Sequence, residues 1–543
     1  MNKIKILLAF IFLMPILVNA QWTTDTNSNT LVVDASGVNA DLKAISTSDG
    51  KTYIVFWEVV APPENYELRL QVLDVDGNQT LGSNGVLVSN TIPMSTFTAM
   101  WTISIDSNDN IYIGVTGTGG GDPAFAFKLD VNGNHLWGTN GLSVGSGNVV
   151  TILPLSSGEA VVSWLSSSLF KAEMQKYDAS GNAVWASTQL IENGSNATVP
   201  ANFFELSGGN FIAIFHSVLS GISTNLYAQR FNVDGIAQWV SPTQISNQST
   251  VFNKFYYGTQ DGDVVYFGYS TSHDNRFDSY VTRINSDGTI PWGINGMDFD
   301  TNQTDFEMDT RIAFSTGSQY IWAICNYTNT SQNQAGEYVQ KFDKVTGVRQ
   351  FTDNAKVVYP ISTDDNVHVD ALQLFGDQPL FLLKSGPDNG ATPTTLSAVL
   401  LDENGDFAWV EESRPIATFS GNKGRIQFTK PVSNQNVTVF IEDKGTGARI
   451  YAQNFIDDAL SINDLENETS LFFNNPIFDY LNVKSTNSIR SISVYNTIGQ
   501  VIFSEKYDYI NDIVINVQKW ESGVYIIKFS TDKGIVSKKI IRK

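Results

Sequence analysis

Short apolar stretches separated by short polar turns follow one another along most of the chain, and long amphipathic helical patterns are absent. Eight of the apolar stretches come directly after a polar turn: TYIVFW (52–57), IYIGV (111–115), EAVVSW (159–164), FIAIF (211–215), VVYFGY (264–269), QYIWAI (319–324), PLFLL (379–383) and VTVFI (437–441). Apolar runs of this length between turn signals are typical of buried β-strands. The pattern therefore predicts an all-β protein built from eight repeated units.

A second turn in each unit is marked by a glycine with a large apolar residue four positions later. The pairs are Gly77/Leu81, Gly133/Trp137, Gly181/Trp185, Gly235/Trp239, Gly288/Trp292, Gly347/Phe351 and Gly405/Trp409. Successive glycines lie 48 to 59 residues apart, a period that is typical of solenoids and propellers. Turns such as Asn232–Gly235 have the composition of a bulged hairpin. We expect the tryptophans to pack between neighbouring units; a sugar-stacking platform is the alternative.

The two ends of the repeated region complement each other. The eighth unit ends with the strand Arg449–Phe455 and lacks a fourth strand, whereas Asn29–Asp34 near the N-terminus resembles Trp137–Val144 of another unit. Closing a ring of sheets in this way leaves only short, protected edges. We therefore predict an eight-bladed β-propeller over residues 21–456, closed by the N-terminal strand, with seven blades as the alternative count.

The charge of the chain restricts the class of partner. The formal net charge is −21; residues 1–20 contribute +2 and residues 461–543 contribute +1, which leaves −24 on residues 21–460. Nucleic acid demands a basic groove for its phosphates, so we expect no nucleic-acid partner. The single cysteine, Cys325, excludes an intrachain disulfide and a cysteine-based metal site, and we expect it to be buried.

Residues 1–20 have the features of a secretory signal peptide. Lys3 and Lys5 precede the apolar stretch Ile6–Leu17, and Val18 and Ala20 supply small residues before a cleavage point at Gln21. A membrane anchor is the alternative, but the apolar stretch is short for a spanning helix. We expect export into the periplasm and a mature chain without a transmembrane segment.

The repeat is interrupted near the C-terminus. Residues 457–470 are polar and acidic and are interpreted as a linker. Residues 471–543 have different strand lengths and a different charge balance, so we predict a second domain there, a small Ig-like β-sandwich.

This last domain carries five motifs in a specific order: Asn475–Asp479, Leu481–Val483, Ser493–Gln500, Ser522–Tyr525 and the basic ending Lys538–Lys543. With these motifs it resembles the C-terminal sorting domain (type A) of proteins exported by the type IX secretion system of Bacteroidota. The residues that carry the resemblance are Asn475, Pro476, Asp479, Leu481, Val483, Tyr495, Asn496, Gly499, Gln500, Gly523, Tyr525, Lys538 and Lys539. The resemblance implies recognition by the outer-membrane secretion machinery, and a passenger that is secreted or attached to the outer cell surface.

The repeated region has a resemblance of its own. The unit that contains Gln340–Gly347 and Phe351 is similar to the tryptophan-docking repeats of quinoprotein-type eight-bladed propellers, in which the motif is structural. Dehydrogenases of that family use a paired-cysteine element near the quinone. Because this chain has one cysteine, we expect no quinone chemistry and no cofactor.

Metal and histidine sites have little support in the sequence. Asp-rich turns such as Asp74–Asn78 resemble the first half of a calcium loop, but the later bidentate carboxylate is missing, so we predict no metal site. The four histidines, His135, His216, His273 and His368, have no metal-ligand spacing.

The connections between the second and third strands of the units vary in length and sequence. They are Val60–Asn65, Thr116–Pro123, Ser217–Thr224, Ser270–Asp278, Tyr327–Gly336, Lys384–Thr395 and Glu442–Ala448. Variable loops on a rigid scaffold are where function concentrates. We therefore predict a ligand site on the face and central mouth that these loops line, with His273, Arg276, Asp278, Tyr327, Lys384 and Asp388 as the candidate contacts.

Three hypotheses for the function follow. The first is a non-catalytic binding module for a glycan or an extracellular protein, and no residue is assigned a catalytic role. The alternative is a polysaccharide lyase or hydrolase with its site at the central mouth, which would need carboxylates or a Tyr/His/Arg set to converge there. The third is a purely structural surface protein.

Overall fold

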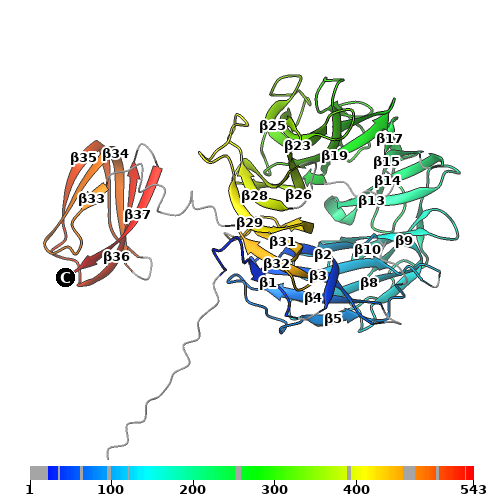
Figure 1. Cartoon of the computed structure of the whole chain (residues 1–543), viewed down its shortest axis with the longest axis horizontal. Coiled ribbons are helices and arrows are strands. Elements are labelled where there is room, and N and C mark those ends of the chain that lie inside the picture. Colours follow the sequence, from blue (N-terminus) through cyan, green and yellow to red (C-terminus); the bar gives the residue numbers. More distant parts are fainter. Residues whose placement is uncertain are drawn as a thin grey trace, which may run out of the picture. The chain divides into compact units, whose positions relative to one another are not determined.

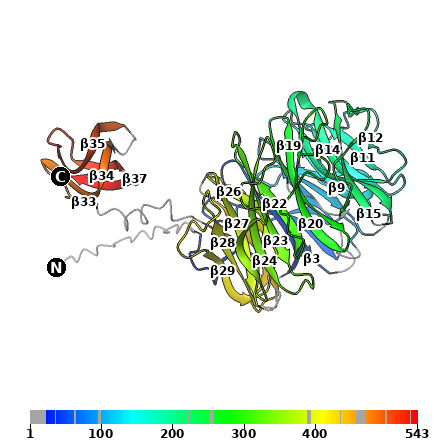
Figure 2. The ribbon, with the colours of Figure 1, turned by 90° about the horizontal axis from the view of Figure 1, so that it is seen from above.

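A computed structural model describes residues 22–34, 37–61, 65–94, 100–119, 121–221, 223–250, 258–387, 393–433, 435–455, 471–496, 500–531 and 534–543. The chain divides into two compact units, Met1–Phe455 and Ile456–Lys543 (Figures 1 and 2). Within the described residues the structure is strand and turn, apart from one 3₁₀ turn at Ser207–Gly209. The all-β class predicted from the sequence is therefore confirmed, and none of the described helices could span a membrane.

Four sheets of the first unit are separate antiparallel meanders of four strands. They consist of β2 (Val38–Ser46), β3 (Thr52–Val59), β4 (Tyr66–Leu73) and β5 (Val86–Ser89); β22 (Phe306–Ala313), β23 (Tyr320–Thr328), β24 (Ala335–Asp343) and β25 (Lys356–Ser362); β26 (Asp365–Phe375), β27 (Gln378–Gly386), β28 (Thr394–Leu400) and β29 (Arg414–Gly421); and β30 (Lys423–Phe428), β31 (Val437–Asp443), β32 (Ala448–Asn454) and β1 (Thr30–Leu31).

Two larger sheets each join two meanders. The seven-stranded sheet contains β6 (Thr102–Ile105), β7 (Ile111–Thr116), β8 (Pro123–Leu129), β9 (Leu142–Pro154), β10 (Ala160–Ser166), β11 (Ala172–Tyr177) and β12 (Gln189–Ile191). The nine-stranded sheet contains β13 (Thr198–Glu205), β14 (Phe211–Ser220), β15 (Ser223–Phe231), β16 (Thr243–Gln244), β17 (Ser249–Thr250), β18 (Gly258–Asp261), β19 (Val264–His273), β20 (Arg276–Ile284) and β21 (Met297–Asp298). Strand β9 belongs to two meanders, because its first part pairs with β8 and its last part with β10.

The N-terminal strand completes the last meander. In β1, Thr30 lies opposite Ala452 and Leu31 opposite Tyr451 of β32, which is the pairing predicted from the sequence. The Asn29 side chain reinforces it by donating hydrogen bonds of 3.0 Å to the Ile416 carbonyl and to the Gln453 side chain. The two ends of the repeated region are thereby joined in one sheet.

The first strand of each meander contacts the first strand of the next. These contacts run from β2 through β6, β9, β13, β18, β22, β26 and β30 and return to β2. Figure 1 shows the sheets of this unit arranged around a common centre. We call these first strands the inner strands.

The eight apolar stretches predicted from the sequence all lie in second strands, namely β3, β7, β10, β14, β19, β23, β27 and β31. A second strand is hydrogen-bonded on both edges and covered on both faces by neighbouring sheets, so both sets of alternating side chains are buried. In β3, the six residues from Thr52 to Trp57 are all buried. This is why these stretches are continuously apolar instead of alternating.

The glycine and the large apolar residue of the repeat meet across neighbouring sheets. The Trp185 indole donates a hydrogen bond of 3.0 Å to the Val233 carbonyl in the next turn, and a Cβ added to Gly235 would lie 2.8 Å from that indole. Trp22 has the same relation to Gly77, with a hydrogen bond of 2.9 Å to the Val75 carbonyl. The tryptophans thus pack between units, as predicted, and leave no room for a side chain at the glycine.

The second unit is one five-stranded antiparallel sheet. It contains β33 (Leu471–Phe473), β34 (Tyr480–Asn496), β35 (Val501–Asn516), β36 (Gly523–Thr531) and β37 (Gly534–Arg542). The 17-residue β34 pairs with β33, β35 and β36, and a single apolar core includes Leu481, Val494 and Phe529.

Candidate functional site

The strands extend further into the second connections than the sequence predicts. Strand β19 continues to His273 and β20 begins at Arg276, so the predicted loop Ser270–Asp278 is a hairpin with a two-residue turn. Asp274 and Asn275 have φ values of 49° and 62°. These left-handed values are those of a type I′ turn, whose twist matches the flanking strands. Arg276 and Asp278 are consequently strand residues.

His273 lines an open, polar depression on this side of the first unit. Its side chain is 45% exposed, and its Nδ1 lies 3.2 Å from an Asp274 carboxylate oxygen. The depression has a volume of about 620 Å³ and is otherwise lined by Asn247, Gln248, Ser249, Ser272, Asp274 and Asn295. It offers hydrogen-bonding groups but little apolar surface.

Three of the predicted residues meet in a buried cluster instead of a loop surface. Arg276 forms an ion pair with Asp278, and its Nη2 lies 3.6 Å from a carboxylate oxygen of Glu307. The Tyr327 hydroxyl donates a hydrogen bond of 2.6 Å to Asp300. Asp300 in turn shares a hydrogen bond with Glu307.

The cluster contains three further carboxyl groups that were not predicted from the sequence, those of Asp298, Asp300 and Glu307. Asp300 and Glu307 are essentially inaccessible to solvent. Only the position of Glu307 in a strand with apolar neighbours could have suggested its burial. We call Asp278, Asp298, Asp300 and Glu307 the acidic cluster.

Burial dominates the protonation of the acidic cluster. It raises the pKa of Asp298 to about 7, with a further increase from Asp278 and Asp300 and a partial offset from Arg349. Burial also raises the pKa of Glu307 well above its ordinary value, and the neighbouring carboxylate of Asp300 adds to this. Both effects favour the protonated form of Glu307. Within the described residues, no group of three or more His, Cys, Asp or Glu side chains is placed to hold a metal ion.

The remaining predicted contacts lie apart from this cluster. Lys384 is a half-buried residue of β27 opposite Val367, and its charge lowers the pKa of Asp365 against the larger, opposite effect of burial. Asp388 lies outside the described residues. The structure thus brings together three of the six predicted residues.

Two potentially reactive side chains are enclosed in the interior. Burial raises the pKa of the Cys325 thiol well above its ordinary value, which makes the thiol unreactive, as its apolar strand suggests. His368 is 2% exposed, and its Nδ1 lies 2.9 Å from the buried carboxylate of Glu337. Neither side chain can reach a ligand in solution.

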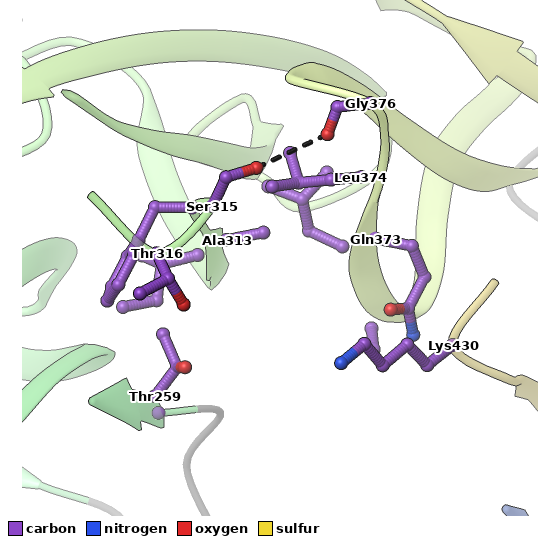
Figure 3. A pocket seen from close by; sticks show the side chains of 13 residues that line it. Thr259, Ala313, Ser315, Thr316, Gln373, Leu374, Gly376 and Lys430 are labelled. Carbon is purple, nitrogen blue, oxygen red and sulfur yellow. Dashed lines mark hydrogen bonds between the residues drawn. The ribbon is translucent and has the colours of Figure 1, made fainter. Parts of the chain in front are cut away.

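A cavity of about 470 Å³ lies against the inner strands (Figure 3). Its polar lining includes Thr259, Ser315, Thr316, Gln373 and Lys430, and its apolar lining includes Ile312, Ala313, Leu372 and Leu374. The turns that border it connect first and second strands. In a meander, these turns lie on the opposite side from the second connections, where the sequence analysis placed the ligand.

Two polar side chains of the cavity lining donate hydrogen bonds to backbone carbonyls. The Gln373 amide donates a hydrogen bond of 3.0 Å to the Phe428 carbonyl, and the Ser315 hydroxyl donates one of 3.3 Å to the Gly376 carbonyl. The Lys430 carbonyl accepts a hydrogen bond of 2.9 Å from Ser46. Figure 3 shows Thr316 and Lys430 on either side of the cavity.

Charged side chains converge on the inner strands next to this cavity. The Trp101 indole donates a hydrogen bond of 2.8 Å to Asp41, and the Arg425 Nε lies 3.5 Å from the other oxygen of that carboxylate. The Lys43 ammonium lies 5.4 Å from the centre of the Trp101 ring. Residues from β2 and β30, about 380 positions apart in the chain, thus share one site.

Asp370 continues this group on β26, at a bulge. The Phe428 amide donates a hydrogen bond of 2.6 Å to its carboxylate, and the Arg311 Nε donates one of 2.8 Å to its carbonyl. Arg311 also forms an ion pair with Asp309 of its own strand. Ala371 follows Asp370 directly and lines the cavity.

In the second unit, residues of the sorting motifs connect the segment before β34 with the C-terminal strand β37. The Asn475 side chain donates a hydrogen bond of 3.1 Å to the Lys539 carbonyl and accepts one of 2.9 Å from the Ile541 amide. Asn496 and Gln500 bond through their side chains across the turn between β34 and β35. The other motif residues lie in β34, β36 and β37 or before β34, except Gly499, which is outside the described residues.

Comparison with known families agrees with this geometry. The model of the secretion system C-terminal sorting domain matches residues 472–543. The C-terminal unit is a type IX secretion sorting domain. A sorting domain of this kind directs its passenger through the secretion machinery to the cell surface or the extracellular space.

The solved structures that match the chain resemble it only distantly. An ulvan lyase matches at 13% identity and a TM-score of 0.43, over 69% of this chain and 96% of its own. An oligogalacturonate lyase in complex with manganese matches at 11% and 0.39, over 78% and 99%. An α-L-arabinanase of Penicillium chrysogenum matches at 12% and 0.32, over 56% and 92%. Likenesses this distant carry no functional argument, and no protein of curated function matches the sequence.

Proposed function

We propose that residues 21–456 form an eight-bladed β-propeller, exported behind a signal peptide at 1–20 and joined by a linker at 457–470 to the sorting domain at 471–543. Three observations support the propeller. The inner strands contact one another in a closed cycle, β1 pairs with β32, and Trp22 packs on Gly77 as Trp185 packs on Gly235. Each meander then corresponds to one blade.

The passenger acts as a non-catalytic binding module in this proposal, and its ligand occupies the cavity at the inner strands. The observation that carries it is the lining of that cavity. Hydroxyl, amide and ammonium groups from β18, the β22–β23 turn, β26 and the segment after β30 line it together with apolar side chains. Such a combination of a few oriented polar groups with apolar surface is typical of small-ligand sites.

A polysaccharide-active enzyme remains the second candidate, because the carboxylates of Asp41, Asp309 and Asp370 lie on inner strands. Each of these carboxylates already accepts a hydrogen bond or an ion pair from the protein. Such engagement favours a supporting role over proton transfer, and a measurement of turnover separates the two candidates.

The test is thermal unfolding of the mature chain with a panel of oligosaccharides. A ligand at about a hundred times its Kd stabilises the folded state by roughly 2.7 kcal/mol. We expect a ligand-dependent shift that Thr316→Val reduces and His273→Ala leaves unchanged. Loss of the shift in His273→Ala alone would move the site to the second connections. Product formation with the stabilising ligand would favour the enzyme.

A further inference from the structure

We propose that the ligand of this cavity is an acidic saccharide, whose carboxylate or sulfate groups are bound by Lys430 in the cavity and by Lys43 and Arg425 on the inner strands β2 and β30. This inference rests on the proposed binding function and names the ligand class for that site. It comes from the distribution of charge over the inner strands.

Lys43 is the first cationic contact. Its ammonium faces the Trp101 ring and makes no hydrogen bond or ion pair with the residues that the structure describes. Burial is the main influence on this ammonium and lowers its pKa. The carboxylates of Asp41 and Asp370 raise that pKa, and the guanidinium of Arg425 lowers it. These effects place one ammonium among charged groups from three inner strands, β2, β26 and β30. An incoming anion would add a charge-assisted hydrogen bond to this ammonium.

Arg425 is the second contact, and its backbone is held in an unfavourable conformation. Its φ is 52°, a left-handed value that a residue with a Cβ rarely adopts. Asp370, on the neighbouring inner strand, has a φ of 62°. Such strained residues cluster at functional sites, where the surrounding structure maintains them. The Arg425 side chain is 55% exposed, so its guanidinium can meet a ligand.

Lys430 is the third contact and lies in the cavity itself. It lines the cavity, and its side chain is exposed. The hydrogen bond from Ser46 to its carbonyl fixes it beside the end of β2, three residues beyond Lys43. The hydroxyls of Thr259 and Thr316 and the Gln373 amide lie in the same cavity and suit the hydroxyl groups of a sugar.

The remainder of the passenger repels a polyanion. Residues 21–460 carry a net charge of −24, whereas the Lys and Arg residues of the inner strands lie only on β2, β22 and β30 within the described structure. Asp41 contacts Arg425 and Trp101, and the Asp370 carboxylate accepts a hydrogen bond from a backbone amide, so both acidic groups are already engaged by the protein. A local cationic centre in an acidic surface concentrates anions at that centre.

The experiment measures binding to the full mature chain by calorimetry with three probes of equal length: a neutral oligoglucan, an oligouronate and a sulfated oligosaccharide. We expect one or both acidic probes to bind at least about tenfold more tightly than the neutral probe, with weaker binding at high salt. Lys43→Met, Arg425→Met and Lys430→Met should each weaken binding of the acidic probes by up to about tenfold. Lys384→Met, a lysine on the opposite side, should leave binding unchanged.

The outcomes separate the two proposals. Lys430 is exposed, so Lys430→Met tests the idea even where a substitution in an inner strand prevents folding. Equal affinity for the neutral probe, or wild-type affinity in Lys430→Met, would overturn the acidic-ligand proposal and leave the binding function standing. Absence of binding by all three saccharides would overturn the saccharide-binding function itself.

Discussion

The hydroxyl group of Tyr327 donates a hydrogen bond of 2.6 Å to the carboxylate of Asp300, and both side chains are buried. Tyr327 lies at the end of β23, whereas Asp300 follows β21 in the preceding meander. Removing the hydroxyl would leave a buried carboxylate without one of its donors. This loss lowers the stability of the folded state, because a buried carboxylate has given up its hydration and needs hydrogen-bond donors from the protein in its place.

Tyr327→Phe is therefore expected to lower the free energy of unfolding by about 1–3 kcal/mol, measured by chemical denaturation. Tyr338→Phe is the matched control. Its ring stacks on that of Tyr327 at 4.0 Å, and its hydroxyl makes no hydrogen bond with the described residues. Equal stability of the two variants would show that the Tyr327 hydroxyl contributes nothing.

The acidic cluster predicts a pH dependence of stability. Because the folded-state pKa of Asp298 is about 7 and its ordinary value is 3.8, the folded state binds this proton more tightly than the unfolded state. The stabilisation of the folded state by this protonation is fully present below about pH 4 and is lost as the pH rises to about 7. Burial raises the pKa values of Asp300 and Glu307 in the same direction.

Asp298→Asn should remove up to about 4 kcal/mol of this pH dependence, because one pKa unit corresponds to roughly 1.4 kcal/mol. The measurement compares the unfolding free energy of the variant and the wild type from pH 4 to pH 8. Parallel curves would contradict the raised pKa of Asp298. Asp274→Asn, at an exposed turn, is the control and should leave the curve unchanged.

Two glycines of one turn separate steric crowding from backbone strain. Gly293 and Gly296 have φ values of 81° and 77°. A Cβ at Gly296 would lie 2.4 Å from the Val281 carbonyl oxygen, whereas a Cβ at Gly293 would meet nothing within 4 Å. Gly293→Ala should cost about 1–2 kcal/mol for the left-handed backbone. Gly296→Ala should cost at least about 2 kcal/mol more, as measured by denaturation.

The N-terminal strand should be essential for the stability of the passenger. Deleting residues 21–34 removes β1, the fully buried Val32 and Val33, and the contact of Trp22 with Gly77. Burial of three large side chains is worth roughly 5 kcal/mol, so the midpoint of thermal unfolding should fall sharply. Deleting residues 457–543 is the control, and it should leave the unfolding of the passenger nearly unchanged. A small effect of the N-terminal deletion would contradict closure by β1.

The sequence alone determined the local structure and the route of export. Continuous apolar stretches marked the second strands, and the Gly235/Trp239 spacing marked a repeated contact, because both depend on neighbours at fixed offsets. The complementary ends of the repeat indicated the pairing of β1 with β32, and motifs such as Asn475–Asp479 identified the sorting domain.

The tertiary structure decided which side chains meet. Tyr327 and Arg276 were singled out as loop residues, but their buried partners come from elsewhere: Asp300 from the connection between β21 and β22, and Glu307 from β22. Lys43 and its neighbours on β26 and β30 are more than 300 residues apart in the chain, and they converge only where the inner strands do. Convergence and burial depend on how successive sheets pack around a centre, a long-range property that no local pattern of residues records.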